Sequence, residues 1–211
     1  MQCPLCNNDE QNVSIQGPDI RLYCLCNQCN LVFTTKENFL SPAEEKQRYS
    51  YHQNTIEDAG YVSFLYKAIT PALRYLKTNA VGLDYGCGPT PTLSKLLLKE
   101  GFVCNDYDPY FFPELKEDIT YDFIFATECF EHFFQPEKEL QKISSLLNEN
   151  GLLIIMTEHW QTESHFANWY YPKDPTHVCF YNSKTFNFIA LKFGFNLLHN
   201  DLKRVIILKK Q

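Results

Sequence analysis

Apolar and polar residues alternate along the second half of the chain in a sequence of predicted strands and helices. Short apolar runs bounded by turn residues predict strands near 80–84, 102–107, 121–126, 151–157, 195–199 and 204–209. Apolar residues three and four positions apart predict helices near 91–100, 136–148 and 183–193. A left-handed residue is expected just past each of these helices, at Gly101, Gly151 and Gly194. The alternation predicts a mostly parallel sheet with helices on both faces, ending in an antiparallel strand pair.

Two more helices are predicted before the first of these strands. Ser41-Pro42-Ala43-Glu44 has the form of a capped helix start, with Ser41 as the cap and Glu44 reaching back. The apolar positions from Tyr61 to about Leu76 follow one helix face. Between them, the polar aromatic segment 49–54 either covers a bound ligand or forms an exposed connector.

The cysteines near the N-terminus have the spacing of a metal site. Cys3 and Cys6 form one CxxC pair, Cys26 and Cys29 form another, and 19 residues separate the pairs. Two such pairs predict a closed tetrahedral zinc site that is structural, because four thiolates leave no open coordination position. Two disulfides are the competing interpretation of these four cysteines. Cys24 could replace Cys26 as a ligand, but only Cys26 has the two-residue spacing to Cys29. We therefore expect a zinc ribbon over 1–38, a helical connector over 39–78 and a larger domain over 79–211.

The motif that carries the most chemical information follows the first predicted strand of the larger domain. An apolar run ends at Asp84, and Gly86-Cys87-Gly88 then leads into a helix, so the pattern is strand, glycine turn and helix start. Such a turn brings backbone N–H groups against a bound cofactor. Asp108 stands 24 residues after Asp84, at the end of the next strand, where an acid can bind ribose hydroxyls; Asp106 is its rival if the register shifts.

The order of these pieces resembles that of the class I S-adenosylmethionine-dependent methyltransferases over roughly residues 79 to 211. The resemblance implies a Rossmann-like sheet and binding of S-adenosylmethionine by seven residues: Asp84, Gly86, Cys87, Gly88, Asp108, Thr127 and Glu128. Tyr121-Asp122-Phe123 matches the family's fourth strand. The chain departs from the pattern at Thr90, where a third glycine is usual. It also has only 13 residues between Asp108 and Asp122, which leaves little room for the family's third strand.

Two histidines are the candidate catalytic residues. His177 lies in segment 169–181, which follows the fifth strand of the family order and holds acidic, imidazole and phenol groups together, so it is a candidate general base. His177 could equally stabilise the turn at Asp174-Pro175. His132, in the Glu131-His132 pair, either orients a substrate or packs as a hydrogen-bonded residue. Five aromatic residues form either a pocket wall or ordinary core: Trp160, Trp169, Tyr170, Phe180 and Tyr181.

Composition narrows the function. The net charge is −6, and residues 1–40 carry four acids against two basic residues, so a nucleic-acid substrate is disfavoured. No apolar run reaches the ~20 residues of a membrane span, and the N-terminus lacks a signal segment, so we expect a cytoplasmic protein. Methyl transfer to a small molecule or a protein side chain is the expected function. The alternatives are RNA base methylation, and a non-catalytic binding or scaffold protein that keeps the fold. The oligomeric state is not predicted.

Overall fold

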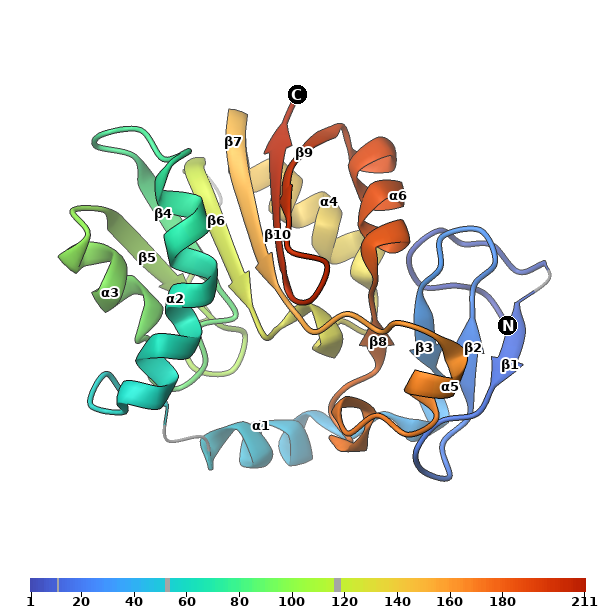
Figure 1. Ribbon diagram of the computed structural model, residues 1–211. Helices are drawn as coiled ribbons and strands as arrows, with labels where there is room; N and C mark the ends of the chain where they lie inside the picture. Colours follow the sequence, from blue (N-terminus) through green and yellow to red (C-terminus); the bar gives the residue numbers. More distant parts are fainter. Residues whose placement is uncertain (11, 52–53, 116–118) are drawn as a thin grey trace.

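The computed structural model describes all residues except 11, 52–53 and 116–118 (Figure 1). Its larger sheet has six strands in the order β5-β4-β6-β7-β10-β9. The four strands β5, β4, β6 and β7 run parallel, β10 runs antiparallel to β7, and β9 runs antiparallel to β10. The strand bounds are β4 Val81–Tyr85, β5 Val103–Tyr107, β6 Tyr121–Thr127, β7 Leu147–Met156, β9 Phe195–Asn200 and β10 Val205–Lys210. This is the class I methyltransferase topology that the resemblance implies, and the described residues place no strand beyond β5.

Helices cover both faces of this sheet. Apolar side chains of α2 (Ala59–Leu73) and α3 (Leu93–Lys99) pack with Phe123, Phe125 and Ile154 on one face. Those of α4 (Pro136–Leu146) and α6 (Ser183–Phe193) pack with Ile124 and Ile155 on the other. Alternate strand residues face opposite sides, so both faces of the parallel strands are buried.

A second sheet is built from the N-terminal ribbon and one strand of the larger domain. Its order is β1 (Val13–Ile15), β2 (Tyr23–Leu25), β3 (Val32–Thr34) and β8 (Cys179–Phe180), all antiparallel neighbours. Cys3, Cys26 and Leu31 belong to the same buried cluster as the α4 and α6 face of the larger sheet. The ribbon is therefore joined to the larger domain by strand pairing and by shared core.

The helix α1 (Pro42–Ser50) lies across the carboxyl ends of the parallel strands, at the bottom of the view in Figure 1. The predicted capping box is present: the Ser41 hydroxyl accepts from the Glu44 N–H at 3.4 Å, and the Glu44 carboxylate accepts from the Ser41 N–H at 2.9 Å. The remaining short elements are η1 Lys36–Asn38, η2 Phe130–His132, α5 Glu163–Phe166 and η3 Tyr171–Lys173. None of the described helices combines the length and apolar character needed to span a membrane.

The structure corrects two details of the sequence prediction. The helix predicted over 136–148 ends at Leu146, because Leu147 already pairs with Tyr121 as the start of β7. Gly151 is not a left-handed helix terminator: it lies inside β7, and Asn150 before it has the positive φ of 64°. Gly101 and Gly194, by contrast, are left-handed as predicted, with φ of 89° and 71°.

A buried histidine makes the stability of this fold depend on pH. His159 is 3% exposed and packs on Phe186, and neither of its ring nitrogens has a hydrogen-bond partner among the described residues. Burial lowers the pKa of His159 to about 4. As the pH falls below 6.5, the unfolded chain binds a proton at this ring that the folded protein does not bind, so the free energy of unfolding decreases.

We predict that His159→Leu removes about 2 kcal/mol of the stability loss between pH 7 and pH 5. The measurement is urea denaturation at both pH values, and the exposed His165→Leu serves as control, with the wild-type dependence expected. Other buried histidines act in the same direction in all three proteins, so the difference isolates His159. An unchanged loss in His159→Leu would contradict the prediction.

Candidate functional site

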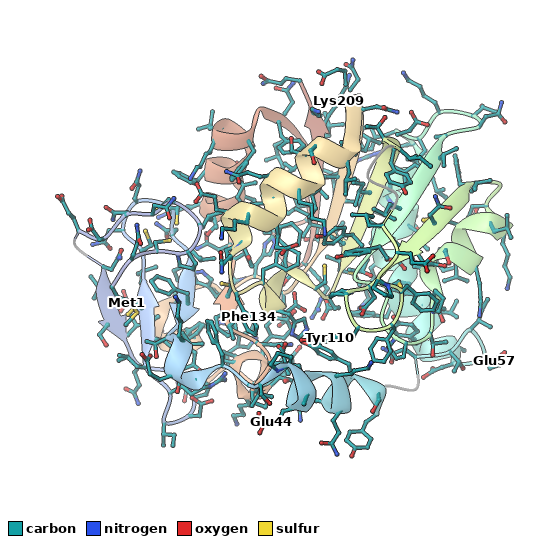
Figure 2. All side chains as sticks on the ribbon, turned by 180° about the vertical axis from the view of Figure 1, so that it is seen from behind. Met1, Glu44, Glu57, Tyr110, Phe134 and Lys209 are labelled. Carbon is teal, nitrogen blue, oxygen red and sulfur yellow. The ribbon has the colours of Figure 1, made fainter. Side chains whose placement is uncertain are left out.

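A cavity of about 760 Å³ opens where the parallel strands end. Its lining includes Tyr85, Tyr107 and Thr127, the last residues of β4, β5 and β6. Glu45 and Tyr49 of α1 line it from the other side. Figure 2 shows Tyr110 and Phe134, two further lining residues, close to α1, with Lys209 at the opposite end of the sheet. The sheet edge therefore forms the floor of the cavity and α1 covers it.

The glycine turn forms one wall of the cavity. Gly86 and Gly88 have positive φ values of 85° and 67°, which only glycine adopts without strain. The N–H groups of Gly86 and Cys87 donate to the Tyr107 carbonyl at 2.8 and 3.1 Å, which ties the turn to the end of β5. All three turn residues, which the sequence analysis predicted to bind the cofactor, line the cavity.

The two predicted cofactor acids occupy different positions. Asp108 lines the cavity; its Oδ2 accepts from the Gly88 N–H at 3.1 Å, and its Oδ1 accepts from the N–H groups of Tyr110 and Phe111. Asp84 is 2% exposed, is not among the lining residues, and its Oδ1 has no partner among the described residues. Burial, with Asp106 and then Asp108 nearby, raises the pKa of Asp84 well above its ordinary value. Asp84 thus lies behind the cavity wall, and Asp108 is exposed to its interior.

Thr127 and Glu128, at the end of β6, also line the cavity. Glu128 has a positive φ of 49°, and its Oε1 accepts from Arg204 Nη1 at 2.8 Å. Burial and then Glu131 raise the pKa of Glu128 to about 8, whereas Arg204 lowers it. Arg204 also binds Glu158, so one guanidinium bridges two acidic side chains.

Glu131 is completely buried beside the same group of charges. Its Oε1 accepts from the Tyr171 hydroxyl at 2.6 Å, and its Oε2 has no hydrogen-bond partner among the described residues. Burial raises the pKa of Glu131. Arg204 lowers the pKa of Glu131 but forms its ion pairs with Glu128 and Glu158, and no arginine among the described residues forms an ion pair with Glu131.

The structure brings the two predicted catalytic histidines together. The rings of His132 and His177 lie 4.8 Å apart between centroids, and both residues line the cavity. The Nδ1 of His132 lies 3.1 Å from the Thr176 carbonyl, and the Nδ1 of His177 lies 2.8 Å from the Tyr171 carbonyl. A carbonyl can only accept, so each Nδ1 carries the hydrogen and each neutral ring has a bare Nε2. Burial lowers the pKa of both rings, that of His177 to about 3 with a contribution from His132, so both are neutral at pH 7.

A second recess of about 520 Å³ lies beyond Glu128 and His177, which line both cavities. Asp174 at its edge forms two hydrogen bonds with Arg48 of α1, both 2.9 Å long. Burial raises the pKa of Asp174, but the hydrogen bonds from Arg48 and Thr176 outweigh burial and bring this pKa below its ordinary value. The turn at Asp174-Pro175 is thus tied to α1, and this bond borders the space next to the histidines.

Acidic residues outnumber basic residues in the lining of the larger cavity. Six carboxyl groups line it against one lysine, Lys138, and both histidines are neutral. Two of the six are paired with an arginine outside the lining: Glu128 with Arg204 and Asp174 with Arg48. The carboxylates are those of Glu45, Asp108, Glu128, Glu131, Glu139 and Asp174. Such a cavity favours a cationic ligand.

The sequence analysis did not identify Glu45 or Arg204 as residues of the site. Glu45 is 3% exposed and accepts from the Tyr110 hydroxyl at 2.7 Å, yet in the sequence it is one acid in a polar helix. Arg204 stands in a turn far from the motifs. Of the aromatic candidates, Trp160, Trp169, Phe180 and Tyr181 are buried core, and Tyr170 borders the second recess. In the segment 49–54, Tyr49 and Asn54 line the cavity, and His52 and Gln53 lie outside the described residues.

The four predicted metal ligands form a separate cluster on the ribbon. The sulfur atoms of Cys3, Cys6, Cys26 and Cys29 all lie within 4.8 Å of one another, and none of the described cysteines forms a disulfide. Each pair closes the same turn, because Asn7 and Asn30 follow the pairs with positive φ and donate to the carbonyls of Cys3 and Cys26. The spare Cys24 contacts Met1 instead of the cluster.

A family model for methyltransferase domains matches residues 58–200. No curated protein matches the chain. Among solved structures, a 1,6-didemethyltoxoflavin N1-methyltransferase from Burkholderia thailandensis, with 1,6-didemethyltoxoflavin and S-adenosylhomocysteine bound, has a TM-score of 0.59 at 13% identity. That match covers 88% of this chain and 98% of the other. A SAM-dependent methyltransferase from Archaeoglobus fulgidus has a TM-score of 0.52 at 16% identity, covering 71% and 99%. At these identities, the likeness shows the fold.

The two turn glycines give a matched pair of mutations. A Cβ on Gly86 would lie 2.7 Å from the Cβ of buried Cys129, whereas a Cβ on Gly88 meets nothing within 4 Å. We predict that Gly88→Ala costs about 1 kcal/mol of unfolding free energy, from its left-handed φ alone. Gly86→Ala should cost about 2–4 kcal/mol, because overpacking adds to the same strain. Urea denaturation measures both, and equal losses would show that the contact with Cys129 carries no cost.

Proposed function

The chain belongs to the methyltransferase-domain family, and on that premise we propose that it transfers a methyl group from S-adenosylmethionine to a small-molecule acceptor. The observation that carries the proposal is the cavity at the carboxyl ends of β4, β5 and β6, with the glycine turn and Asp108 in its wall. Its volume of about 760 Å³ falls in the range of small-ligand pockets. Its excess of carboxylates suits the positive sulfonium of the cofactor.

In the proposed arrangement, Gly86, Cys87 and Gly88 provide the surface against which the methionine end of the cofactor lies. Asp108 accepts hydrogen bonds from the ribose hydroxyls, and its three backbone hydrogen bonds hold the carboxylate in place. Asp84 acts from behind the turn as a buried support. Thr127 and Glu128 lie beside the sulfonium end.

The acceptor is proposed to lie between the larger cavity and the second recess, next to His132 and His177. When bound, the cofactor supplies a methyl group on a good leaving group, so alignment with the acceptor contributes much of the rate. Because each histidine has an unprotonated Nε2 and both rings line the cavity side by side, we propose these two as the residues that act on the acceptor. Either ring can take a proton from an acceptor that must lose one.

A small molecule is favoured because α1 covers one side of the site. Glu45 and Tyr49 of α1 line the cavity opposite the sheet, and the Arg48–Asp174 pair borders the adjoining recess. An RNA substrate needs exposed basic surface, yet Arg21 of the ribbon is bound to Asp19. Thr90, at the position where a third glycine is usual, does not disturb the start of α3, because Leu93 and Leu96 in its first turn are buried. These observations favour methylation of a small molecule over RNA methylation or a non-catalytic scaffold role.

The cysteine cluster is proposed to hold one structural zinc ion. Four sulfur atoms bound tetrahedrally at about 2.3 Å lie about 3.8 Å apart, and the Cys3–Cys29 and Cys6–Cys26 sulfur pairs are 3.5 Å apart. The Leu5 carbonyl accepts from Lys192 of α6 at 3.0 Å, so the ribbon braces the larger domain. Cysteines that form no disulfide fit a reducing compartment such as the cytoplasm.

We predict that S-adenosylmethionine binds the wild-type protein with micromolar affinity, worth about −8 kcal/mol, in a calorimetric titration. Asp108→Ala should weaken this binding by at least about tenfold, or 1.4 kcal/mol, because the ribose loses its acceptor. The matched control is Glu149→Gln, an exposed acid at the other end of the sheet, which should bind as the wild type does. A well-folded wild-type protein that binds no cofactor would overturn the proposal.

Zinc content gives a second test, with Cys24 as the built-in control. We predict one zinc ion per chain in the wild type and in Cys24→Ser, and loss of zinc from Cys26→Ser. The reason is that, of these two cysteines, only Cys26 belongs to the four-cysteine cluster. Metal analysis of protein purified without chelators measures this. Equal zinc content in the two variants would rule out the assigned ligand set.

A further inference from the structure

We propose that Glu131, His132 and His177 form a binding site for one divalent transition-metal cation, separate from the cysteine cluster. One carboxylate oxygen and one ring nitrogen of each histidine all lie within 4.8 Å of one another. The Nε2 of His132 is 4.0 Å from the Oε1 of Glu131. Two imidazoles and one carboxylate are a ligand set that suits first-row cations and leaves coordination positions open.

The outer contacts of the two histidines prepare them as ligands. Each ring donates Nδ1–H to a backbone carbonyl, His132 to Thr176 and His177 to Tyr171, which fixes the ring and leaves Nε2 unprotonated. Metal-binding histidines are usually held in this way by a carbonyl or carboxylate. The two rings lie 4.8 Å apart between centroids, and a nitrogen of each lies within 4.8 Å of the Glu131 carboxylate, so one cation fits among the three residues.

The carboxylate of Glu131 is also held by a hydrogen bond from a neighbouring residue. Tyr171 donates to Glu131 Oε1 at 2.6 Å, and Oε2 of this completely buried residue has no hydrogen-bond partner among the described residues. A buried carboxylate oxygen without a hydrogen-bond partner is costly when the group is ionised. A bound cation would give this oxygen the partner that Arg204, already bound to Glu128 and Glu158, does not provide.

The site is reachable and needs only small movements. All three residues line the larger cavity, and His177 also borders the second recess. Ligands of one cation at about 2.1 Å lie roughly 3–3.5 Å apart, so side-chain rotations must close the gaps by about 1 Å. The open positions of the cation would then point into the space assigned to the acceptor.

The role that we assign to the cation rests on the proposed function. It would hold the acceptor through an oxygen atom, and a hydroxyl bound there would ionise more readily than in water. The two imidazoles would then serve as ligands, and the cation would take over from them the activation of the acceptor. The acceptor class that fits is a small molecule with an oxygen able to bind a divalent cation.

The test is a cobalt titration of the full-length protein with its cysteine cluster kept loaded with zinc. We expect one zinc and one cobalt ion per wild-type chain by metal analysis, with visible d–d absorption and no thiolate-to-cobalt charge-transfer band. Glu131→Gln, His132→Gln and His177→Asn should each weaken cobalt binding by more than about 100-fold, because even outer-shell changes cost 10–100-fold. The exposed His165→Asn should bind cobalt as the wild type does.

Cofactor binding in the same samples separates the possible failures. A variant counts as evidence only if its circular dichroism spectrum matches that of the wild type. If one of the three variants fails to fold, the other two still test the site. A wild-type protein that binds S-adenosylmethionine but no cobalt would overturn the cation site and leave the proposed function standing. Cobalt bound equally by the wild type and all folded variants would also overturn the site. Cobalt binding that needs the three residues, without cofactor binding, would support the site and count against methyl transfer.

Discussion

The parallel pairing of β4 with both β5 and β6 is the constraint on which the site depends. It places Asp84 opposite Asp106 and ends three strands at one edge, where Asp108 and Glu128 follow. Carboxylates gathered at one partly dehydrated edge repel one another, and burial raises the pKa of Asp84 and Glu128. The fold therefore gathers acidic side chains around the cavity before any ligand binds, at a cost to their ionised forms. A cationic cofactor, and a cation near Glu131, would both stabilise the ionised carboxylates.

The ribbon contributes to the same edge from the opposite end of the sequence. β3 pairs with β8, and the Thr34 N–H donates to the Val178 carbonyl, while the Val178 N–H donates to the Glu131 carbonyl. This chain of backbone hydrogen bonds fixes His177 beside Glu131 and His132. If the ribbon is held by zinc, as proposed, the metal stabilises the geometry of a site in another part of the molecule without contacting it.

The sequence predicted what local patterns determine. Alternating periodicity identified the strands and helices, and the spacing of glycines and acids located the turn and Asp108. The shortness of the segment after Asp108 indicated that the third strand has little room, and the described sheet ends at β5. Contacts between distant segments were not predictable: no local pattern shows that Glu45 is buried against Tyr110, that Arg204 binds Glu128, or that β8 joins the ribbon. Each depends on the tertiary packing of elements that are far apart along the chain.

The most direct test of the account is a crystal structure of the protein with S-adenosylhomocysteine. The account predicts the ribose hydroxyls on the carboxylate of Asp108, the methionine end against Gly86-Cys87-Gly88, and the sulfur directed toward Glu128 and the two histidines. A ligand bound in this way would support the assignment of the glycine turn and Asp108 to the cofactor, and of the space next to the two histidines to the acceptor. Electron density for the ligand elsewhere, or none in crystals soaked at saturating concentration, would contradict it.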